Sequence, residues 1–495
     1  MYGTISMRAI LTYPIISAAL ACLSLQGAPK GAKPNIVVIL ADDMNRHHPG
    51  FNGGPVSTPN LDRLARKGTR MTQFYVHAVC SPTRAAFLTG RYPFRNGMEE
   101  RSHGNDVAGM LTDERTLADA FGEAGYYTAI VGKWHLGNWY KRHLPMQRGF
   151  DYQYGLYGAL IGYYTKCRER YYDWHRNGQV LREEGYSTEL IGREFVKVVK
   201  AHNFDKPFFA YVPFNAVHGP NEAPPELLKK YTALVENRPG KQSPSEKQFD
   251  ATKYAMLESM DQAVGTMITA LKERGVLDNT LIVFFNDNGG RKSNPPFRGG
   301  KGDTLEGGVR VPCIFHWPGK IRANQSVDGM MHVVDLYPTL LGIGGGSLRQ
   351  KLPIDGVDMW KTITMGKASP RSEVVHALPG ENADTGVMSI RRGSYKLVGE
   401  ALFNIEKDSA EMTDIADAHP EVYKALHQRL IHLVAKRRTP ETHKNITRTI
   451  EQPLLVFGKD ENANPPNWLP PYLKALPPTK RELKNSKRKG GGGSK

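Results

Sequence analysis

Cysteine is scarce in this chain, with four residues in 495, and this scarcity excludes a small domain held together by disulfides. After the N-terminal segment, no apolar run reaches the roughly 20 residues that a membrane-spanning helix needs, so we expect no transmembrane span. A nucleic-acid-binding motif is also missing, and we expect no nucleic-acid partner. The charged share of 23% and the apolar share of 40% are ordinary, which argues against wholesale disorder, collagen and coiled coil.

Acidic residues are outnumbered by basic ones, and the formal net charge is +17. Residues 474–495 alone hold eight lysines and arginines against Glu482, and the rest of the excess is spread over the chain. Such an excess suits an acidic substrate or partner, and it equally suits a basic, solvated surface. The length is sufficient for a large core and for two or three domains.

The N-terminal segment has the pattern of an export signal. Arg8 supplies a positive charge, and the largely apolar residues 10–25 that follow are too few for a membrane span. We expect cleavage between Ala21 and Lys33 and an exported protein, periplasmic or secreted. A weak lipoprotein box makes a lipid anchor at Cys22 the less favoured alternative. The three cysteines that remain leave at least one thiol unpaired.

Strand and helix patterns alternate from about residue 34 to about residue 346. Residues 36–40 form a continuous apolar run, as expected of a strand buried on both faces. Further runs of this kind occupy residues 128–131, 208–212 and 281–285. One helix is predicted to begin at Pro59 with Thr58 as its N-cap, and another is predicted to cover residues 116–124. The pattern predicts an α/β fold, with a large, mostly parallel central sheet sandwiched by helices.

A smaller unit is predicted after the central sheet. Short strands at residues 387–390, 395–398 and 402–405 are separated by turns, and a helix follows from Glu421 to about Lys436. This indicates a smaller C-terminal antiparallel sheet plus one helix. The expected division is a leader at 1–33, a main α/β domain at 34–380, a C-terminal α+β domain at 381–452, and a loosely ordered basic tail at 453–495.

Reactive side chains follow four of the predicted strands. In open α/β sheets, ligands bind outside the carboxyl ends of the strands. The side chains at these ends are Asp42 and Asp43, Lys133 and His135, His218, and Asp287 and Asn288. Three carboxylates and an amide oxygen suit a hard cation, Ca²⁺ or Mg²⁺, and no zinc motif is present. The alternative is that Asp42 and Asp287 only cap helices.

The most specific pattern in the chain is C-x-P-x-R, formed by Cys80, Pro82 and Arg84. Proline suits the first turn of a helix, so Cys80 is expected at the positive helix N-terminus with Arg84 one turn further on. A tyrosine-phosphatase loop is excluded, because its arginine stands six residues after the cysteine and Ala86 occupies that place. A small buried thiol or a helix cap is the alternative.

These residues resemble the sulfatase family of the alkaline-phosphatase-like superfamily. Residues 80–84 with 88–91 match the family's first signature, and residues 125–137 match its second. The resemblance runs from about residue 34 to residue 438 and is nearest to the arylsulfatase B-like, or N-acetylgalactosamine-4-sulfatase-like, branch. Other stretches that fit the family are Asp42-Asp43, Asp287-Asn288-Gly289, and Lys301 with Glu306-Gly307-Gly308.

The resemblance implies that a formylglycine-generating maturation enzyme oxidises Cys80. The aldehyde of formylglycine hydrates to a diol, and one hydroxyl attacks the sulfur of a sulfate ester. The second hydroxyl then loses its proton, so that the aldehyde reforms and sulfate leaves, whereas a plain alcohol would remain sulfated. The family's enzymes are sulfuric ester hydrolases, and the resemblance implies Ca²⁺, or possible Mg²⁺, as the bound cation.

The resemblance also implies a role for each matching residue. Arg84 would steady the diol, and Lys133 and Lys301 would bind the sulfate oxygens. His218 would protonate the leaving oxygen, a role that Lys301 could share. His135 would accept the proton whose loss triggers sulfate release. The implied cation ligands are Asp42, Asp43, Asp287, Asn288 and the modified Cys80.

Other functions remain open at this point. A phosphoryl-ester hydrolase of the wider superfamily is one, although a second set of His and Asp ligands for a two-metal site is not found near the strands. A non-catalytic glycan-binding protein that keeps the fold is another, and the intact Cys80 with its partners argues against it. Taken alone, His135 and His218 could be ordinary structural residues, and Lys133 and Lys301 surface charges.

The sequence does not define the substrate beyond a sulfated carbohydrate. The branch resemblance favours galactosamine 4-sulfate or galactose 4-sulfate, which leaves glycosaminoglycans and marine galactans open. An aromatic and basic segment could line a sugar subsite or could equally be a packed loop. Its members are Tyr163, Tyr164, Arg168, Arg170 and Trp174. The oligomeric state is unknown.

Overall fold

The computed structural model describes residues 33–99, 109–138, 140–168, 171–291, 293–377 and 388–438 of the chain. Residues 1–32 of the predicted leader, which include Cys22, lie outside these ranges, as do Arg170 and the basic tail. None of the described helices has both the length and the apolar character that a membrane crossing requires.

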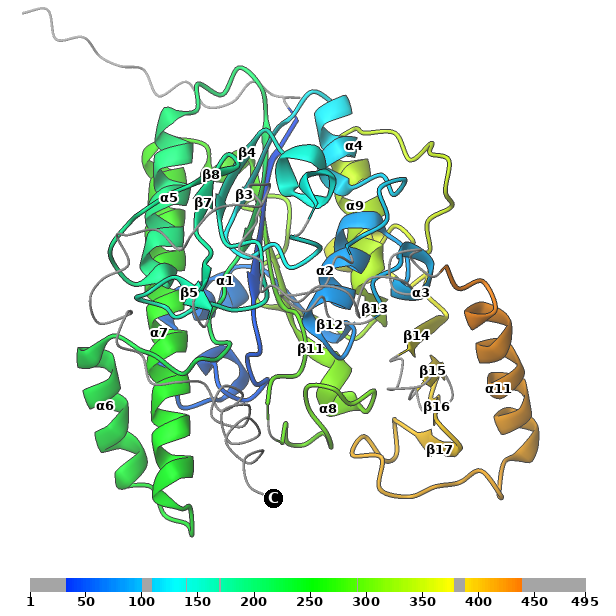
Figure 1. The fold of residues 1–495 in the computed structure, drawn as a ribbon. Coiled ribbons are helices and arrows are strands. Elements are labelled where there is room, and N and C mark those ends of the chain that lie inside the picture. The colour runs from blue at the N-terminus through cyan, green and yellow to red at the C-terminus, as the bar shows by residue number, and fades with distance from the viewer. Residues whose placement is uncertain are drawn as a thin grey trace, which may run out of the picture.

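An eleven-stranded sheet forms the centre of the molecule (Figure 1). In its middle, β1 (Asn35–Ala41) lies between β9 (Phe208–Pro213) and β10 (Thr280–Asn286), and both pairings are parallel. The parallel part continues from β9 to β3 (Tyr127–Val131) and β4 (Tyr152–Gly155). All residues of β1 and β10 are buried, which is why these strands were predictable as apolar runs.

Antiparallel pairs occur on both sides of this parallel middle. On the β10 side, β11 (Arg310–His316) and β2 (Thr69–Tyr75) follow in antiparallel order. Two short strands, β12 (Gln325–Val327) and β13 (Met331–His332), pair with β2 in parallel. On the β4 side lies the hairpin of β7 (His175–Arg176) and β8 (Gln179–Val180). The mostly parallel sheet is therefore confirmed, with antiparallel pairs on both sides of its middle.

Helices cover both faces of this sheet (Figure 1). Alternate β1 residues point to opposite faces, so Ile36 and Val38 join one apolar core and Val37 and Ile39 join the other. The first core is covered by α2 (Cys80–Thr89), α4 (Leu117–Glu123) and α9 (Leu336–Ile343). The second is covered by α1 (Pro59–Arg66), α5 (Ser187–Ala201) and α7 (Pro244–Glu273).

The remaining elements are short or peripheral. The helix α6 (Pro225–Glu236) packs against α7. A two-stranded sheet consists of β5 (Cys167–Arg168) and β6 (Tyr171–Tyr172). The short α-helices are α3 (Pro93–Asn96), α8 (Glu306–Val309) and α10 (Trp360–Met365). The 3₁₀ helices of the described residues are Gly50–Asn52, Lys141–His143, Pro145–Gln147, Leu277–Asn279 and Val333–Asp335.

The small C-terminal unit is an antiparallel sheet covered by one helix, as the sequence predicts. Its strands are β14 (Glu373–Ala377), β15 (Met388–Arg392), β16 (Tyr395–Val398) and β17 (Ala401–Asn404). The helix α11 (Pro420–Val434) buries Leu426, Leu430 and Leu433 against this sheet. These residues belong to the same apolar cluster as one face of the large sheet, so the two units share a core.

Candidate active site

The register of two neighbouring strands brings the acidic residues together. Ala41 at the end of β1 lies opposite Asn286 at the end of β10, so Asp42 and Asp287 emerge side by side. The backbone N–H of Asp43 donates to Asp287 Oδ1 at 3.2 Å. Asn286 ties the two strand ends together, because its amide accepts from the Met44 N–H at 3.1 Å and donates to the Met44 carbonyl.

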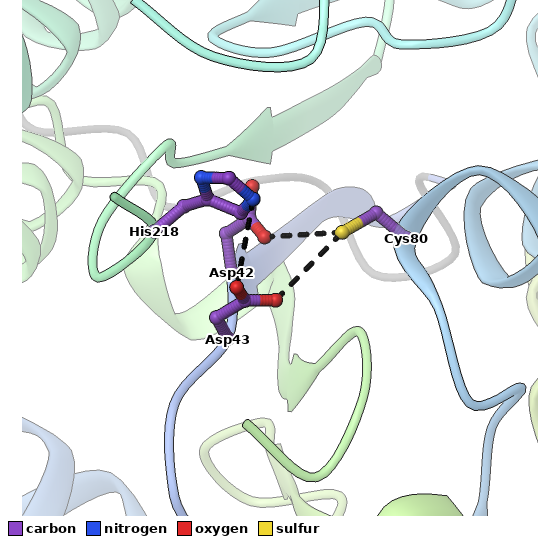
Figure 2. A group of neighbouring side chains, drawn as sticks. All are labelled: Asp42, Asp43, Cys80 and His218. Atoms are coloured by element: carbon purple, nitrogen blue, oxygen red, sulfur yellow. Dashed lines mark hydrogen bonds and ion pairs between the residues drawn. The ribbon is translucent and has the colours of Figure 1, made fainter. Parts of the chain in front are cut away.

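Cys80 is the first residue of α2, as its place in the motif predicts. Its thiol donates to Asp42 Oδ1 at 3.4 Å and to Asp43 Oδ1 at 3.8 Å (Figure 2). The residue is only 2% exposed, and burial together with the charges of Asp287 and Asp42 raises the thiol's pKa well above its ordinary value. The unmodified side chain is therefore a neutral thiol, a poor nucleophile.

Arg84 lies one turn further along α2 and is fully buried. Its guanidinium contacts Asp287 Oδ2 at 2.9 Å and Asp42 Oδ2 at 3.3 Å. It also donates to the carbonyl of Lys133 at 3.0 Å, at the end of β3. One side chain thus connects three strand ends at the same edge of the sheet.

Two lysines pair with the two aspartates that follow β1. The Lys133 ammonium contacts Asp42 Oδ2, and the Lys301 ammonium lies 2.6 Å from Asp43 Oδ1. Burial alone would raise the pKa of Asp42, but Lys133 and the other cations beside it outweigh burial and lower that pKa. Burial likewise opposes ionisation of Asp43, and His218 and Lys301 more than offset it. Both carboxylates are therefore ionised at neutral pH.

Asp287 differs from the other two carboxyl groups. Burial and the neighbouring charge of Asp42 raise its pKa to about 6 despite the contact with Arg84. Three carboxyl groups at one point repel one another, and this repulsion is relieved by a proton or by a cation.

His218 reaches the cluster from the segment after β9. Its Nε2 lies 3.5 Å from Asp43 Oδ2 (Figure 2). Its Nδ1 lies 2.6 Å from the Gly219 carbonyl oxygen. A carbonyl only accepts, so Nδ1 carries a hydrogen and Nε2 is the nitrogen that faces the site. Burial lowers the pKa of His218 to about 4.

His135 lies two residues beyond Lys133 on the segment after β3. It is buried, and its backbone N–H donates to the Tyr157 carbonyl at 3.0 Å. Its φ of 62° lies in the left-handed region, as does the φ of 59° at Asp43. Residues other than glycine rarely adopt this backbone conformation, and those that do are enriched at functional sites.

Several of these side chains could hold a cation together. Asp42, Asp43, Cys80 and His218 each offer a ligand atom, and these atoms lie within 4.8 Å of one another. The donors are mostly carboxylate oxygens, which suits a hard divalent cation. Asn288 donates its Nδ2 to Asp287 Oδ1 at 2.7 Å, while its oxygen accepts from the Gly290 N–H. For that oxygen to bind a cation, the amide must turn over.

Sequence reasoning missed Lys253. This residue of α7 is 2% exposed, and its ammonium donates to the Val217 carbonyl, next to His218. Burial lowers its pKa to about 8, with Asp43 and Asp42 acting in the opposite direction. A lysine inside the apolar stretch 251–257 was the available signal, because a helix face that packs on a sheet does not ordinarily carry one.

The aromatic segment near His218 is mostly packed rather than open. Tyr163 is 1% exposed, and its hydroxyl donates to the carbonyls of Asn215 and His218. Trp174 is fully buried, whereas Tyr164 is exposed. For Tyr163 and Trp174 the geometry favours the packed-loop interpretation, and the Tyr163 contacts help to hold the His218 segment.

Known proteins resemble this chain in sequence and in overall fold. Residues 34–346 match the family model described as Sulfatase. Arylsulfatase J of Mus musculus is 32% identical over 401 residues, which cover 78% of this chain and 64% of that protein's length. N-acetylgalactosamine-6-sulfatase of Mus musculus is 34% identical over 408 residues, or 76% of this chain and 74% of that protein.

A solved structure shares the fold over most of its length. The crystal structure of Ps i-CgsB has a TM-score of 0.76 and 31% identity, over 83% of this chain and 94% of that chain. The same protein is also known in complex with k-i-k-neocarrahexaose.

Proposed function

This chain belongs to the sulfatase family of sulfuric ester hydrolases, and we propose that it removes sulfate from a sulfated sugar or polysaccharide by formylglycine chemistry at Cys80. The observation that carries the proposal is the position of Cys80. It begins α2 and touches two ionised aspartates. Buried cations surround the same point, and such a site suits an anionic substrate.

Conversion of Cys80 to formylglycine is supported by the state of its thiol. A buried thiol with a raised pKa is not an activated nucleophile. Hydrated formylglycine would supply a hydroxyl for attack on sulfur and a second hydroxyl for releasing sulfate. Arg84 fits the role of orienting this group, because Asp287 and the Lys133 carbonyl fix its guanidinium one helical turn from Cys80.

The proposed cation is Ca²⁺, with Mg²⁺ as the alternative. Its ligands would be Asp42, Asp43, Asp287, Asn288 and the modified Cys80. The fit rests on the converging carboxylate oxygens, whose mutual repulsion a divalent cation relieves. When bound, it would supply positive charge next to the reacting sulfate group.

Lys133 and Lys301 are proposed to bind the sulfate oxygens. Both ammonium groups lie at the same sheet edge as Cys80, each paired with one aspartate. Fixed positive charges stabilise a transition state when negative charge develops beside them in a buried site. Lys253 adds a further buried positive charge near Asp43.

His218 is proposed to protonate the leaving sugar oxygen. Its Nδ1 hydrogen is held by Gly219, so Nε2 is the nitrogen that would carry the transferred proton, once the negative charge of a bound sulfate ester has raised the pKa of the ring from about 4. His135 is proposed to accept the proton whose loss releases sulfate, and Lys301 could share the acid role of His218.

The proposed substrate carries sulfate on galactose or N-acetylgalactosamine, at the 4-position by the branch resemblance. The relatives do not decide the position, since one is an N-acetylgalactosamine-6-sulfatase and a structural neighbour is known in complex with k-i-k-neocarrahexaose. The net charge of +17 suits a polyanionic carbohydrate. We further propose that the protein is exported, to the periplasm or medium, after a maturation enzyme has modified Cys80.

A two-part experiment tests this proposal. The chain is produced with a formylglycine-generating enzyme, and mass spectrometry of the Cys80 peptide should show the aldehyde. The protein is then assayed on sugars sulfated at defined positions and on matching phosphate esters. Active protein with an unmodified thiol would refute the formylglycine assignment. A preference for phosphate esters would identify a phosphoryl hydrolase, and binding without turnover a glycan-binding protein.

A further inference from the structure

A second buried ionic cluster joins the small C-terminal sheet to the large unit. Lys396 of β16 lies 2.9 Å from Glu306 Oε1 and 2.9 Å from Glu411 Oε1, and all three side chains are buried. Glu411 also accepts the backbone N–H of Glu306 at 2.6 Å. We call Glu306, Lys396 and Glu411 the joint triad. It fixes the first residue of α8 from the side of the small sheet.

Within the triad, Glu306 is ionised, whereas burial raises the pKa of Glu411. Burial works to raise the pKa of Glu306, but Lys396 and nearby arginines outweigh burial and lower that pKa. Tyr75 adds a hydrogen bond to Glu306 Oε2 at 2.7 Å. A buried carboxylate with this many donors keeps one position, because any displacement leaves a buried charge unpaired.

The helix α8 that the triad holds contacts three segments of the candidate active site. The carbonyl of Gly308 accepts the N–H of Gly289, the residue after Asn288, at 2.8 Å. The carbonyl of Val309 accepts the N–H of Val76, in the segment that leads to Cys80, at 2.8 Å. The N–H of Gly307 donates to the carbonyl of Arg298, in the loop that carries Lys301, also at 2.8 Å.

These backbone contacts leave no room for adjustment. A Cβ atom at Gly289 would lie 1.8 Å from the Gly307 oxygen, and one at Gly308 would lie 2.0 Å from the Asp303 oxygen. Only glycine permits such close approach. A shift of α8 is therefore passed on to its neighbours instead of being absorbed by side chains.

Lys301 depends on this arrangement for its position. Its own N–H donates to the Gly290 carbonyl at 2.7 Å, and the Gly302 N–H donates to the Ala78 carbonyl at 2.9 Å. The loop is thus held between the Asn288 segment, the Cys80 segment and α8. Its ammonium then reaches Asp43.

We propose that Lys396 and Glu411 of the small C-terminal unit are positioning residues for Lys301, so that this unit completes the active site. The sulfate-binding role of Lys301 rests on the proposed function, whereas the contacts of the joint triad do not. The alternative is that the triad only attaches the small sheet to the large one.

The first test compares three variants of the full chain. Lys396→Met removes the charge, Lys396→Arg keeps it, and Arg392→Met breaks an exposed ion pair with Glu373 in the same small sheet. We expect kcat/KM on a sulfate ester to fall about 10- to 100-fold in Lys396→Met. Most of the loss should appear as a higher KM. Inorganic sulfate should also inhibit the variant less strongly than the wild type. Lys396→Arg should recover most of the activity, and Arg392→Met should match the wild type.

A double variant separates positioning from stability. If Lys396 acts through Lys301, adding Lys396→Met to Lys301→Ala should lower kcat/KM less than twofold further. A double variant whose loss of kcat/KM equals the product of the two single losses would overturn the proposal. Folded Lys396→Met protein with wild-type kcat/KM would overturn it as well. Should Lys396→Met fail to fold, Glu411→Gln, which keeps an acceptor for the Glu306 N–H, takes its place.

Hydrogen exchange tests the inference without sulfatase activity. In Lys396→Met, the amides of Lys301, Gly302 and Gly307 should lose protection while those of β1 keep it. Unchanged protection would overturn the inference, whether or not the wild type hydrolyses sulfate esters. A wild type that cleaves no sulfate ester, combined with lost protection in the variant, would overturn the proposed function and limit Lys396 to positioning the loop.

Discussion

The two buried ionic clusters of this protein are built in opposite ways. At the candidate active site, carboxylates from Asp42 and Asp43 converge on one point with Cys80, and the cations stand around them. In the joint triad the chain's own cation, Lys396, stands between the two carboxylates. A cluster with carboxylate oxygens at its centre suits a bound metal cation. A cluster with a lysine at its centre already has its negative charges paired. Burial and charge count alone do not distinguish a site from a structural contact.

The largest effect is expected from a change at the centre of the first cluster. Cys80→Ser keeps one hydroxyl and lacks the second that formylglycine provides, so sulfate bound to serine has no route of release. Sustained sulfate release should fall by about 10³-fold or more, with at most one turnover per site. Intact-mass measurement should find a sulfated protein, and repeated turnover by verified Cys80→Ser protein would refute the proposed role.

At the centre of the second cluster, the expected loss is one of stability. Lys396→Met leaves Glu306 and Glu411 buried without their cation, and the free energy of unfolding should fall by about 3–5 kcal/mol. Urea denaturation compares this variant with Arg392→Met, whose exposed ion pair contributes less than about 1 kcal/mol. Equal midpoints for the two variants would mean that the triad is not a stabilising contact.

A change at the edge of the first cluster should weaken its cation. Asp287→Asn removes one carboxylate charge while keeping the size of the side chain, and we expect the Kd for Ca²⁺ to rise about 10- to 100-fold. Thermal unfolding at increasing Ca²⁺ concentration measures this Kd. Chelation should abolish wild-type activity and added Ca²⁺ should restore it. If the protein keeps its rate of hydrolysis after a chelator has removed the cation, these residues are not the ligands of a required cation.

A third buried cluster lies where the two units meet and consists of uncharged histidines. It predicts how stability depends on pH. The rings of His77, His332 and His376 are buried with centroids 4.9–5.7 Å apart. Burial lowers the pKa of His77 to about 3, and burial with nearby cations lowers those of the other two well below 6.5. Between pH 6.5 and these lowered pKa values, the three histidines bind protons in the unfolded chain and stay neutral in the folded one. The stability that they contribute is therefore retained above pH 6.5 and falls as the pH decreases.

The smallest predicted effect is the share of one histidine in this pH dependence. Each histidine that stays neutral lowers the free energy of unfolding by about 1.4 kcal/mol per pH unit below 6.5. His376→Gln should remove one such share, measured as the slope of unfolding free energy between pH 6.5 and 5. A slope equal to the wild-type slope would show that His376 is not held neutral in the fold.

The sequence predicted the parts of the fold that are buried on both faces. The strands β1, β3, β9 and β10 are continuous apolar runs, and all four are confirmed. The strands β2 and β11 were not predicted, because polar residues interrupt β2 without a regular alternation and β11 contains a proline. Their pairing is antiparallel and depends on residues more than 200 positions apart, which no local pattern reports.

The candidate site follows the same division. Motif residues such as Cys80 and Arg84 could be named from spacing, because a helix start places them one turn apart. Lys253 and Asn286 belong to no such motif, and their roles arise from the fold that buries them beside the acidic residues. Glu306 was visible as part of a family pattern, but its partner Lys396 lies 90 residues away on another sheet.

The pairing of β1 with β10 also limits which changes of chain length the protein tolerates. Asp42 stays beside Asp287 only while Ala41 faces Asn286. One residue inserted into β1 would displace Asp42 by a strand step of about 3.3 Å or exchange the two faces of a strand buried on both. The turn at residues 239–241 between α6 and α7 is different, since all three residues are exposed and a Cβ atom at Gly240 meets nothing within 4 Å. An epitope tag or a fused domain belongs in that turn, and related chains should vary in length there while β1 and β10 keep theirs.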